Sequence, residues 1–262
     1  MQNFEFVRPT SVADAVAALK GDEAQPMSGG QTLMPTMKAR LAAPEILVSL
    51  TAIDEMKGVR KDGDQIWIGG GTTHATVARE TAESFPALSS LAGRIGDPSV
   101  RSRGTIGGSI ANNDPSACYP AGALGSGATI VTDRREIAAD DFFQGMFMTA
   151  LEEGEIVTAV KFPVPQKAIY QKFIQPASRF PLTAVFVAHF GDTVRVAVTG
   201  ASSDGVFRWT EAEEALQGNF SADAVSGLSV SADTMISDLH GSGAYRAQLT
   251  KVMTQRAVAA LA

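Results

Sequence analysis

Two glycine-paired segments most constrain how this chain can fold: SGGQT at Ser28 to Thr32 and TIGGS at Thr105 to Ser109. Both interrupt apolar, strand-like stretches. Because glycine has no Cβ, it adopts positive φ at low cost and lets a backbone come close to a ligand. Consecutive N–H groups in such segments can converge on a diphosphate. Together they predict one extended, phosphorylated ligand held at both ends, although either segment alone is more simply a turn.

The glycines do not fit the common nucleotide-binding motifs. A P-loop ends in Gly-Lys followed by Ser or Thr, and the chain contains no such run. A Rossmann site needs G-x-G-x-x-G at the start of a helix, but Gly69 to Gly71 is followed by two threonines. The run Gly104 to Gly108 has a different spacing. A phosphorylated ligand would therefore be bound in another way.

Size and charge limit the classes of function. At 262 residues the chain lies near the roughly 250–300 residues at which single cores give way to several domains, so two or three lobes are expected. The net charge of −6 argues against nucleic acid or an anionic membrane surface as the main partner. We interpret the arginines at Arg94, Arg101 and Arg103 as members of structural salt bridges rather than as a phosphate clamp.

Cys118 is the only cysteine, and the three histidines lie far apart in the sequence. No internal disulfide and no thiolate metal cluster can form, so any iron–sulfur centre must belong to another chain. The N-terminus lacks a signal-peptide pattern and no apolar run approaches 18 residues, so we expect a cytoplasmic protein without membrane insertion. No paired carboxylates, Ser/His/Asp set or metal-ligand pattern stands out, so no catalytic side chain is predicted.

The first predicted lobe covers residues 1–55. Ser11 can cap a helix that begins at Val12, because Asp14 completes an S-x-x-D capping box. The run Leu33 to Leu41 predicts a short helix, and Glu45 to Leu50 predicts a buried strand. These elements favour a small α/β unit.

The second predicted lobe covers residues 56–165. Gln65 to Gly69 alternates as a strand, and Thr76 to Arg94 has helical spacing with an interruption at Pro86. The remaining predicted elements are a helix from Tyr119, a hairpin around Asp133 to Arg135 and a strand from Ile156 to Phe162. The prolines of FPVPQK then mark a linker.

The third predicted lobe covers residues 166–262. Ala184 to Phe190 and Val194 to Thr199 predict an antiparallel pair, and Thr210 is the expected cap of the following helix. The final helix is predicted from Ser242 to Leu261. Its apolar stripe is expected in the core and consists of Tyr245, Leu249, Val252, Met253, Ala257 and Leu261.

Long strings of the sequence resemble one family, the FAD-binding medium subunit of molybdenum hydroxylases, which includes carbon monoxide dehydrogenase and xanthine dehydrogenase. The matching strings cover nearly the whole chain and are Pro26 to Leu50, Ile68 to Val77, Ile95 to Leu124, Tyr170 to Val185 and Asp238 to Val258. The resemblance implies an α+β fold. It would have two FAD-binding lobes of the p-cresol methylhydroxylase type and a C-terminal lobe with an antiparallel sheet and helices.

The resemblance also implies the residues that bind FAD. The first glycine segment matches the family's first diphosphate loop and the second matches its other FAD loop, with Ile106 close to the isoalloxazine. Asn112, Asp114 and Lys172 are expected near the flavin, although a solvated strand lysine is an equally good interpretation of Lys172. The implied residues of the two segments are Ser28, Gly29, Gly30, Gln31, Thr32, Thr105, Ile106, Gly107, Gly108 and Ser109.

Two further residues need comment. Relatives commonly read D-P-x-x-D-x-P where this chain reads DPSACYP, so Cys118 occupies the position of an aspartate that helps to hold the cofactor. A thiol accepts hydrogen bonds weakly, so the change is expected to weaken FAD binding, unless Cys118 is simply a small buried residue. His74 is expected at a helix start as a surface or capping residue and is assigned no role.

The resemblance implies an electron-transfer function. A molybdenum-containing large subunit would oxidise the substrate, and a small subunit with 2Fe–2S clusters would pass the electrons to FAD in this chain. NAD, oxygen or a quinone would then accept them, and the complex is expected to be a dimer of heterotrimers. Two alternatives stay open: a stand-alone flavin oxidase or reductase, and a non-enzymatic scaffold that has lost FAD.

Overall fold

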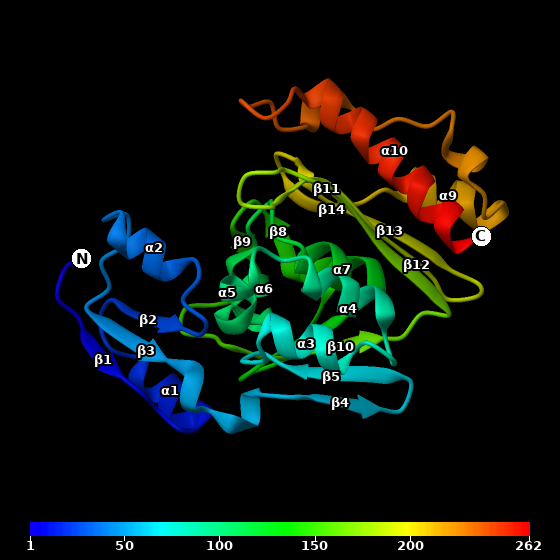
Figure 1. The fold of residues 1–262 in the computed structure, drawn as a ribbon. Coiled ribbons are helices and arrows are strands. Elements are labelled where there is room, and N and C mark those ends of the chain that lie inside the picture. Colours follow the sequence, from blue (N-terminus) through cyan, green and yellow to red (C-terminus); the bar gives the residue numbers. More distant parts are fainter.

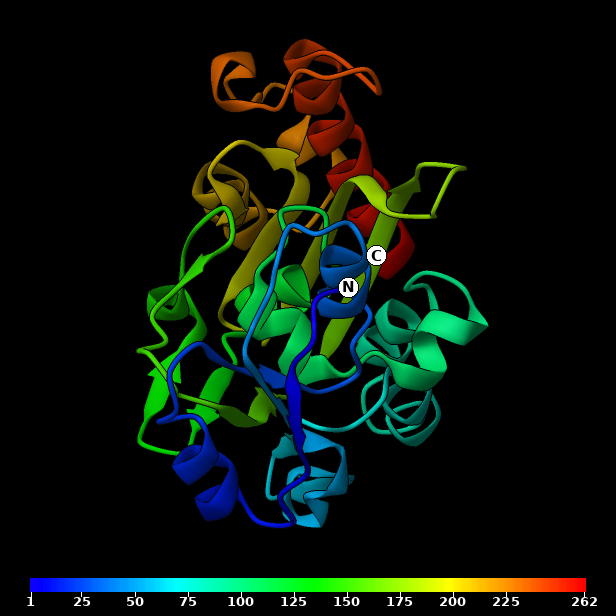
Figure 2. The same cartoon turned by 90° about the vertical axis from the view of Figure 1, so that its left-hand side faces the viewer.

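The computed structural model describes residues 1–262 and contains three main sheets (Figure 1). They lie within the segments 1–55, 56–165 and 166–262, whose use as lobe boundaries stays a proposal. The mixture of helices and mainly antiparallel sheets agrees with the predicted α+β class. In Figure 2, viewed from the side of the first sheet, helix α10 lies at the opposite end of the molecule from α1.

The first sheet has three parallel strands in the order β1-β3-β2. Ser11 caps α1 as predicted, because its hydroxyl accepts a hydrogen bond from the Asp14 N–H at 3.1 Å. Helix α2 ends before the predicted Leu41, since Arg40 takes a positive φ of 62°. The elements are β1 (Glu5–Val7), α1 (Val12–Ala18), β2 (Ala24–Met27), α2 (Leu33–Lys38), β3 (Ile46–Ser49), and the 3₁₀ turns η1 (Leu50–Ala52) and η2 (Asp54–Met56).

The second sheet is antiparallel, with strand order β4-β5-β10-β6-β7. The strand β10 returns from far along the chain to lie at the centre, between β5 and β6, and this pairing holds the segment together. The strands are β4 (Val59–Asp62), β5 (Gln65–Gly69), β6 (Thr129–Thr132), β7 (Glu136–Ala138) and β10 (Val157–Pro163). A separate two-stranded sheet pairs β8 (Phe143–Gly145) with β9 (Met148–Thr149) after the short helix α8 (Ala139–Phe142).

A layer of helices covers one face of the second sheet (Figure 1). It comprises α3 (His74–Glu80), α4 (Pro86–Gly93), α5 (Pro98–Arg103), α6 (Ile106–Asn112) and α7 (Tyr119–Ser126). Pro86 separates α3 from α4, as predicted. Helix α7 is buried along its whole length, because the second sheet and the third sheet enclose it from opposite sides.

The third sheet is an antiparallel meander of β11 (Lys167–Ile174), β12 (Pro181–His189), β13 (Val194–Ser202) and β14 (Gly205–Arg208). One face packs on α4 and α7, and the other packs on α10 (Gly243–Leu261) and α9 (Thr210–Gly218). Since both faces are covered, β12 is apolar without alternation and is buried from Pro181 to Ala188. Two 3₁₀ turns, η3 (Ala222–Val225) and η4 (Ala232–Thr234), connect α9 to α10.

Several sequence predictions about single residues are wrong. Thr210 is the first residue of α9 rather than its cap, and no side chain caps that helix. Tyr245 does not belong to the buried stripe of α10, since it is 44% exposed. None of Arg94, Arg101 and Arg103 forms a salt bridge. Arg94 and Arg101 instead donate to backbone carbonyls.

Candidate functional site

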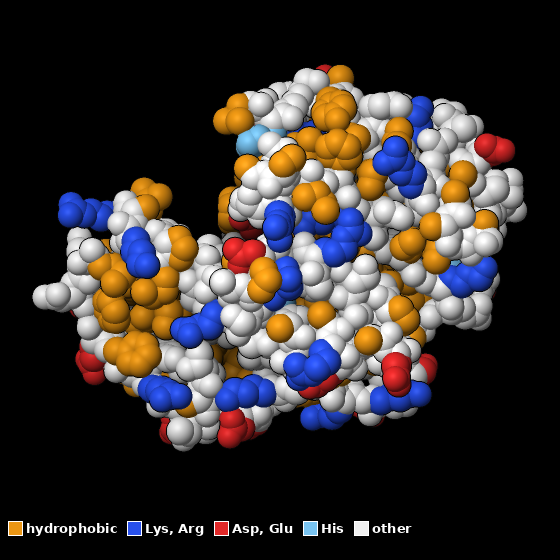
Figure 3. All heavy atoms as spheres, in the orientation of Figure 1, with side chains coloured by type: hydrophobic (Ala, Val, Ile, Leu, Met, Phe, Trp, Pro, Cys, Tyr) orange, Lys and Arg blue, Asp and Glu red, His pale blue; other side chains and the backbone are white.

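A cleft of about 780 Å³ opens between the first sheet and the layer of helices. The space-filling view shows the molecule hollowed between the first sheet, on the left, and the third sheet (Figure 3). Its walls come from several separate parts of the chain, which include β2 and the segment after it, residues between Gly104 and Cys118, residues between Thr149 and Val157, and the turn between β11 and β12. The volume is within the range of small-molecule and cofactor pockets.

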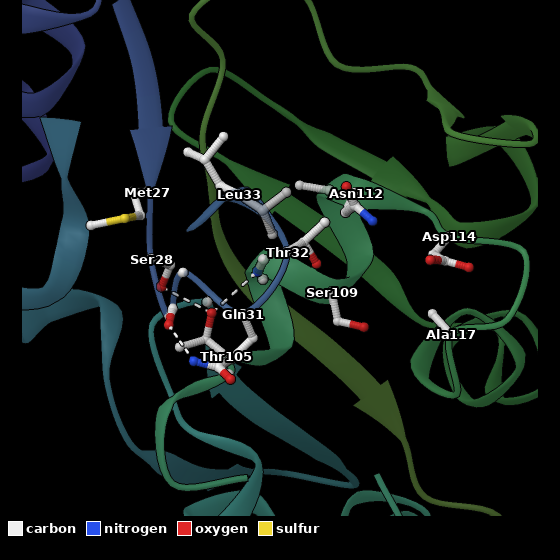
Figure 4. Close-up of a pocket in the computed structure, with 18 of the residues that line it drawn as sticks. Met27, Ser28, Gln31, Thr32, Leu33, Thr105, Ser109, Asn112, Asp114 and Ala117 are labelled. Atoms are coloured by element: carbon white, nitrogen blue, oxygen red, sulfur yellow. Dashed lines mark hydrogen bonds between the residues drawn. The ribbon is translucent and has the colours of Figure 1, made fainter. Parts of the chain in front are cut away.

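The two glycine segments meet on one wall of this cleft. The Thr105 hydroxyl donates a hydrogen bond to the Ser28 hydroxyl at 2.9 Å, and the two side chains lie next to each other in Figure 4. A Cβ on Gly29 would lie only 2.1 Å from the carbonyl oxygen of Arg103. The prediction that the segments hold opposite ends of a ligand is therefore wrong, because they form a single crossing.

The first segment has free hydrogen-bond donors. The backbone N–H groups from Gly29 to Thr32 have no acceptor in the protein. Gly30 has a positive φ of 67°, which orients this stretch of backbone differently from a strand. The Gln31 side chain donates to the carbonyl oxygen of Gly29 at 3.2 Å. Neighbouring unpaired N–H groups beside a cleft form a cradle for an anionic group such as a diphosphate.

The second segment has only one such donor. Its residues Ile106 to Ser109 form the first turn of α6 and their N–H groups are already used, which leaves the Thr105 N–H without an acceptor. Ile106 donates to the Thr72 carbonyl and Gly107 to the Gly70 carbonyl, while Gly108 donates to the Thr105 hydroxyl. A Cβ on Gly107 would lie 2.7 Å from the Gly70 carbonyl oxygen, so contact with protein backbone requires this glycine. The second segment therefore offers fewer free N–H groups than the first, and its Thr105 hydroxyl contacts the first segment at Ser28.

The structure brings the predicted site residues together with one exception. All of them line the cleft except Ile106. This residue is the first of α6, and its side chain is fully buried in the core. Ser109, Asn112 and Asp114 follow along the wall beyond Thr105 (Figure 4). The Asp114 carboxylate accepts the Ser116 N–H at 2.8 Å, which shapes the turn between α6 and α7.

Lys172 and Cys118 form a buried contact at the cleft. Lys172 is 5% exposed, so its interpretation as a solvated strand lysine is wrong. Its ammonium donates to the Arg94 carbonyl at 2.8 Å and to the Cys118 sulfur at 3.5 Å. Burial lowers the pKa of Lys172, because the charged form loses hydration. Cys118 is buried, as the simpler of its two interpretations requires, and it also lines the cleft.

Comparisons with known proteins decide the family. Residues 2–165 match the family described as "FAD binding domain in molybdopterin dehydrogenase". The chain belongs to this family. It is 34% identical to the carbon monoxide dehydrogenase medium chain of Afipia carboxidovorans, over 98% of this chain and 96% of that protein. It is 32% identical to the nicotine 6-hydroxylase medium subunit of Paenarthrobacter nicotinovorans, over 97% and 95% of the two chains.

A solved structure agrees. A chain of reconstituted carbon monoxide dehydrogenase from Oligotropha carboxidovorans superposes with a TM-score of 0.89 at 32% identity, covering 100% of this chain and 99% of that chain. The predicted family, fold class and cofactor are confirmed: the chain is an FAD-binding medium subunit of the molybdenum hydroxylase type. Its unpaired N–H groups beside a cleft fit the diphosphate of FAD.

Sequence reasoning missed His74. This residue begins α3 and is 5% exposed, so its interpretation as a surface residue is wrong. Its backbone N–H donates to the Gly104 carbonyl, and its ring lies against Tyr119 and borders the cleft. Burial, with a smaller contribution from the Arg101 charge, lowers the pKa of His74 to about 4. The triple glycine just before Thr72-Thr73-His74 was the available signal of a close backbone approach.

The neutral, buried His74 predicts a loss of stability in acid. The unfolded chain takes up a proton near pH 6.5, whereas the folded protein does so only near pH 4. The free energy of unfolding should therefore decrease as the pH falls from 6.5 to 4, by about 2 kcal/mol at pH 5. Urea unfolding of His74→Gln at pH 7.5 and pH 5 should show a smaller acid-side loss than the unmodified chain. His189→Gln is the control, and an equal loss in His74→Gln would contradict the prediction.

Two general features complete the site. No group of three or more His, Cys, Asp or Glu side chains is arranged to hold a metal ion. None of the helices combines the length and the apolar character that crossing a bilayer requires.

Proposed function

We propose that this chain binds FAD in the cleft through the residues that line it. The observation that carries the proposal is the row of unpaired N–H groups from Gly29 to Thr32, which faces a cleft of suitable size. These groups would hold the diphosphate, and the Ser28–Thr105 hydrogen bond would keep the cradle in place. Ser109, Asn112, Asp114, Cys118 and Lys172 would contact the rest of the cofactor elsewhere along the cleft.

The protein's role is to bind and orient the cofactor. FAD supplies the electron-transfer chemistry when it is bound. The side chains of the cleft position it and exclude water, and no acid or base from this chain is needed. The electrons would come from 2Fe–2S clusters of a small partner subunit and would leave to an external acceptor.

The partner subunits follow from the chain's own limits and from its relatives. A single cysteine cannot ligate an iron–sulfur cluster, so the cluster ligands must come from another chain. The relatives in carbon monoxide dehydrogenase and nicotine 6-hydroxylase are named as medium chains or subunits. We propose a cytoplasmic complex with a molybdenum-binding large subunit and a 2Fe–2S small subunit, assembled as a dimer of heterotrimers.

Co-expression with the neighbouring reading frames tests the assembly. Size-exclusion chromatography should recover one species that contains this chain, an iron–sulfur protein and a molybdenum protein. Substrate oxidation by the purified single chain would overturn the proposal in favour of a stand-alone flavin oxidase. Failure to associate with any iron–sulfur protein encoded nearby would also overturn it.

FAD binding should stabilise the purified chain. A ligand that binds only the folded state, at about 100 times its Kd, stabilises it by roughly 2.7 kcal/mol. For a chain of this size that corresponds to a rise in Tm of roughly 5 to 10 °C. Thermal melts of flavin-free protein with and without FAD measure the shift, with riboflavin as a control that lacks the diphosphate. An unchanged Tm at saturating FAD would favour a scaffold that has lost the cofactor.

A further inference from the structure

Three cationic side chains occupy one region beside the cleft without a carboxylate partner. Lys172, Arg94 and Arg101 form none of the molecule's salt bridges. The two arginines donate to backbone carbonyls, and among the three only Lys172 lines the cleft itself. The Asp114 carboxylate lines the same cleft but accepts the Ser116 N–H instead of forming an ion pair.

No carboxylate lies within salt-bridge distance of the Lys172 ammonium, and the neighbouring phenols do not supply a negative charge. The buried tyrosines Tyr119 and Tyr170 lie beside Cys118, and burial raises the pKa of both phenols, so they stay neutral. An ammonium has three N–H donors, and the only acceptors in hydrogen-bonding distance are the Arg94 carbonyl oxygen and the Cys118 sulfur. One donor is left for a group in the cleft.

Another part of the cleft lining has a different charge arrangement. Glu152 and Glu155 line it there, and both are paired with arginines. Glu155 contacts Arg135 at 2.9 Å and Glu152 contacts Arg134 at 3.0 Å. Charges at that part are balanced, whereas the buried ammonium of Lys172 is not. A ligand that becomes more negative during its reaction is therefore favoured most where it lies near Lys172.

We propose that Lys172 favours the reduced state of an FAD held in this cleft with its flavin ring near Lys172, because the Lys172 ammonium lines the cleft and lacks a carboxylate partner. The inference rests on the proposed function. Reduction adds electrons to the flavin ring, and a nearby cation in a poorly hydrated site stabilises the negative charge that develops there. Lys172 is thus a positioned charge that sets the reduction potential of the flavin.

The same geometry gives Cys118 a role. A carboxylate at this position would lie at the Lys172 ammonium, which contacts the Cys118 sulfur at 3.5 Å. An ion pair would form and would cancel the charge. Cys118 therefore keeps Lys172 available to the cofactor. Cys118→Asp should therefore lower the flavin's reduction potential.

The test compares the affinities of oxidised and reduced FAD for the full chain. FAD titration gives the Kd of the oxidised form, and dye equilibration gives the two-electron potential. Lys172→Met should weaken the binding of reduced FAD at least tenfold more than that of oxidised FAD. This difference corresponds to a fall of about 30 mV in the two-electron reduction potential of the bound flavin. Sulfite, which adds to flavin to give an anion, should bind the Lys172→Met protein at least tenfold more weakly. Lys251→Met, on α10, is the matched control and should match the unmodified chain in both measurements.

A second pair of variants leaves the lysine in place. Cys118→Asp and Cys118→Asn differ in charge but hardly in size, so the potential of the aspartate variant should be about 30 mV lower than that of the asparagine variant. This pair decides the question if Lys172→Met does not fold. Equal potentials in this pair would overturn the inference, as would an equal loss of affinity for both redox states in Lys172→Met. Failure of the unmodified chain to bind FAD would instead overturn the proposed function, and this inference with it.

Discussion

Gly29→Val should abolish FAD binding at micromolar cofactor while the third sheet and its helices stay folded. The Cβ at this position would lie 2.1 Å from the Arg103 carbonyl oxygen and 2.6 Å from the Gly104 Cα. Both contacts are with backbone, and the Gly104 carbonyl is itself hydrogen-bonded to the His74 N–H. The segment after β2 must therefore move away from α5 and α6, and the cradle of N–H groups moves with it.

The Kd for FAD should rise about 100-fold, which corresponds to a loss of roughly 2.7 kcal/mol of binding free energy. Titration of flavin-free protein by flavin fluorescence measures it, and circular dichroism checks that the fold is retained. Gly218→Val is the matched control, because a Cβ at the end of α9 meets no atom within 4 Å. Full flavin occupancy in Gly29→Val would show that the crossing of the two segments does not build the cofactor site.

Arg246→Met should strongly destabilise the folded chain. Arg246 is 2% exposed and lies in α10. Its guanidinium donates to the carbonyls of Leu182 and Gly200, each at 2.7 Å, and makes two hydrogen bonds to Asp238 at 2.9 Å. Methionine fills similar space but leaves the two carbonyls and the carboxylate without their donor.

The Asp238 carboxylate is 37% exposed and can be hydrated, but each buried carbonyl left without its donor costs roughly 1–3 kcal/mol. The Tm should fall by roughly 10 °C, as measured by thermal unfolding followed by circular dichroism. Arg256→Met is the control, because Arg256 is an exposed arginine of the same helix with no salt bridge. If Arg246→Met lowers the Tm no more than Arg256→Met does, the hydrogen bonds of the buried guanidinium do not stabilise the fold and Arg246 contributes only packing.

Local patterns in the sequence predicted elements wherever the determining contacts lie within a few residues. The bounds of β5 agree with Gln65 to Gly69, and Ser242 caps α10 through the Tyr245 N–H. Pro86 divides the predicted helical stretch, because proline lacks the N–H that a continuous helix needs. The glycine segments were recognised for the same reason, since their composition is a local property.

The family resemblance identified the cofactor and a set of site residues that all line the cleft except Ile106, but not how they act. The second glycine segment looked like a second phosphate loop, yet its N–H groups bond to Thr72, Gly70 and Thr105. Gly70 and Thr72 lie just after β5 and far from this segment in the sequence, so these hydrogen bonds are long-range contacts, which no periodicity reports. Ile106 is buried for the same reason, because the direction of its side chain depends on where α6 packs.

The sequence by itself determined the family, the α+β class, the glycine segments and the absence of an internal thiolate cluster. Tertiary structure alone decided which of these residues meet. Ser28 and Thr105 are separated by 77 positions, and Cys118 and Lys172 by 54, yet both pairs are in contact. Burial depends on the packing of distant elements, so only the folded chain shows that Lys172 is removed from water. That loss of hydration is the physical reason why the pKa of Lys172 is lowered.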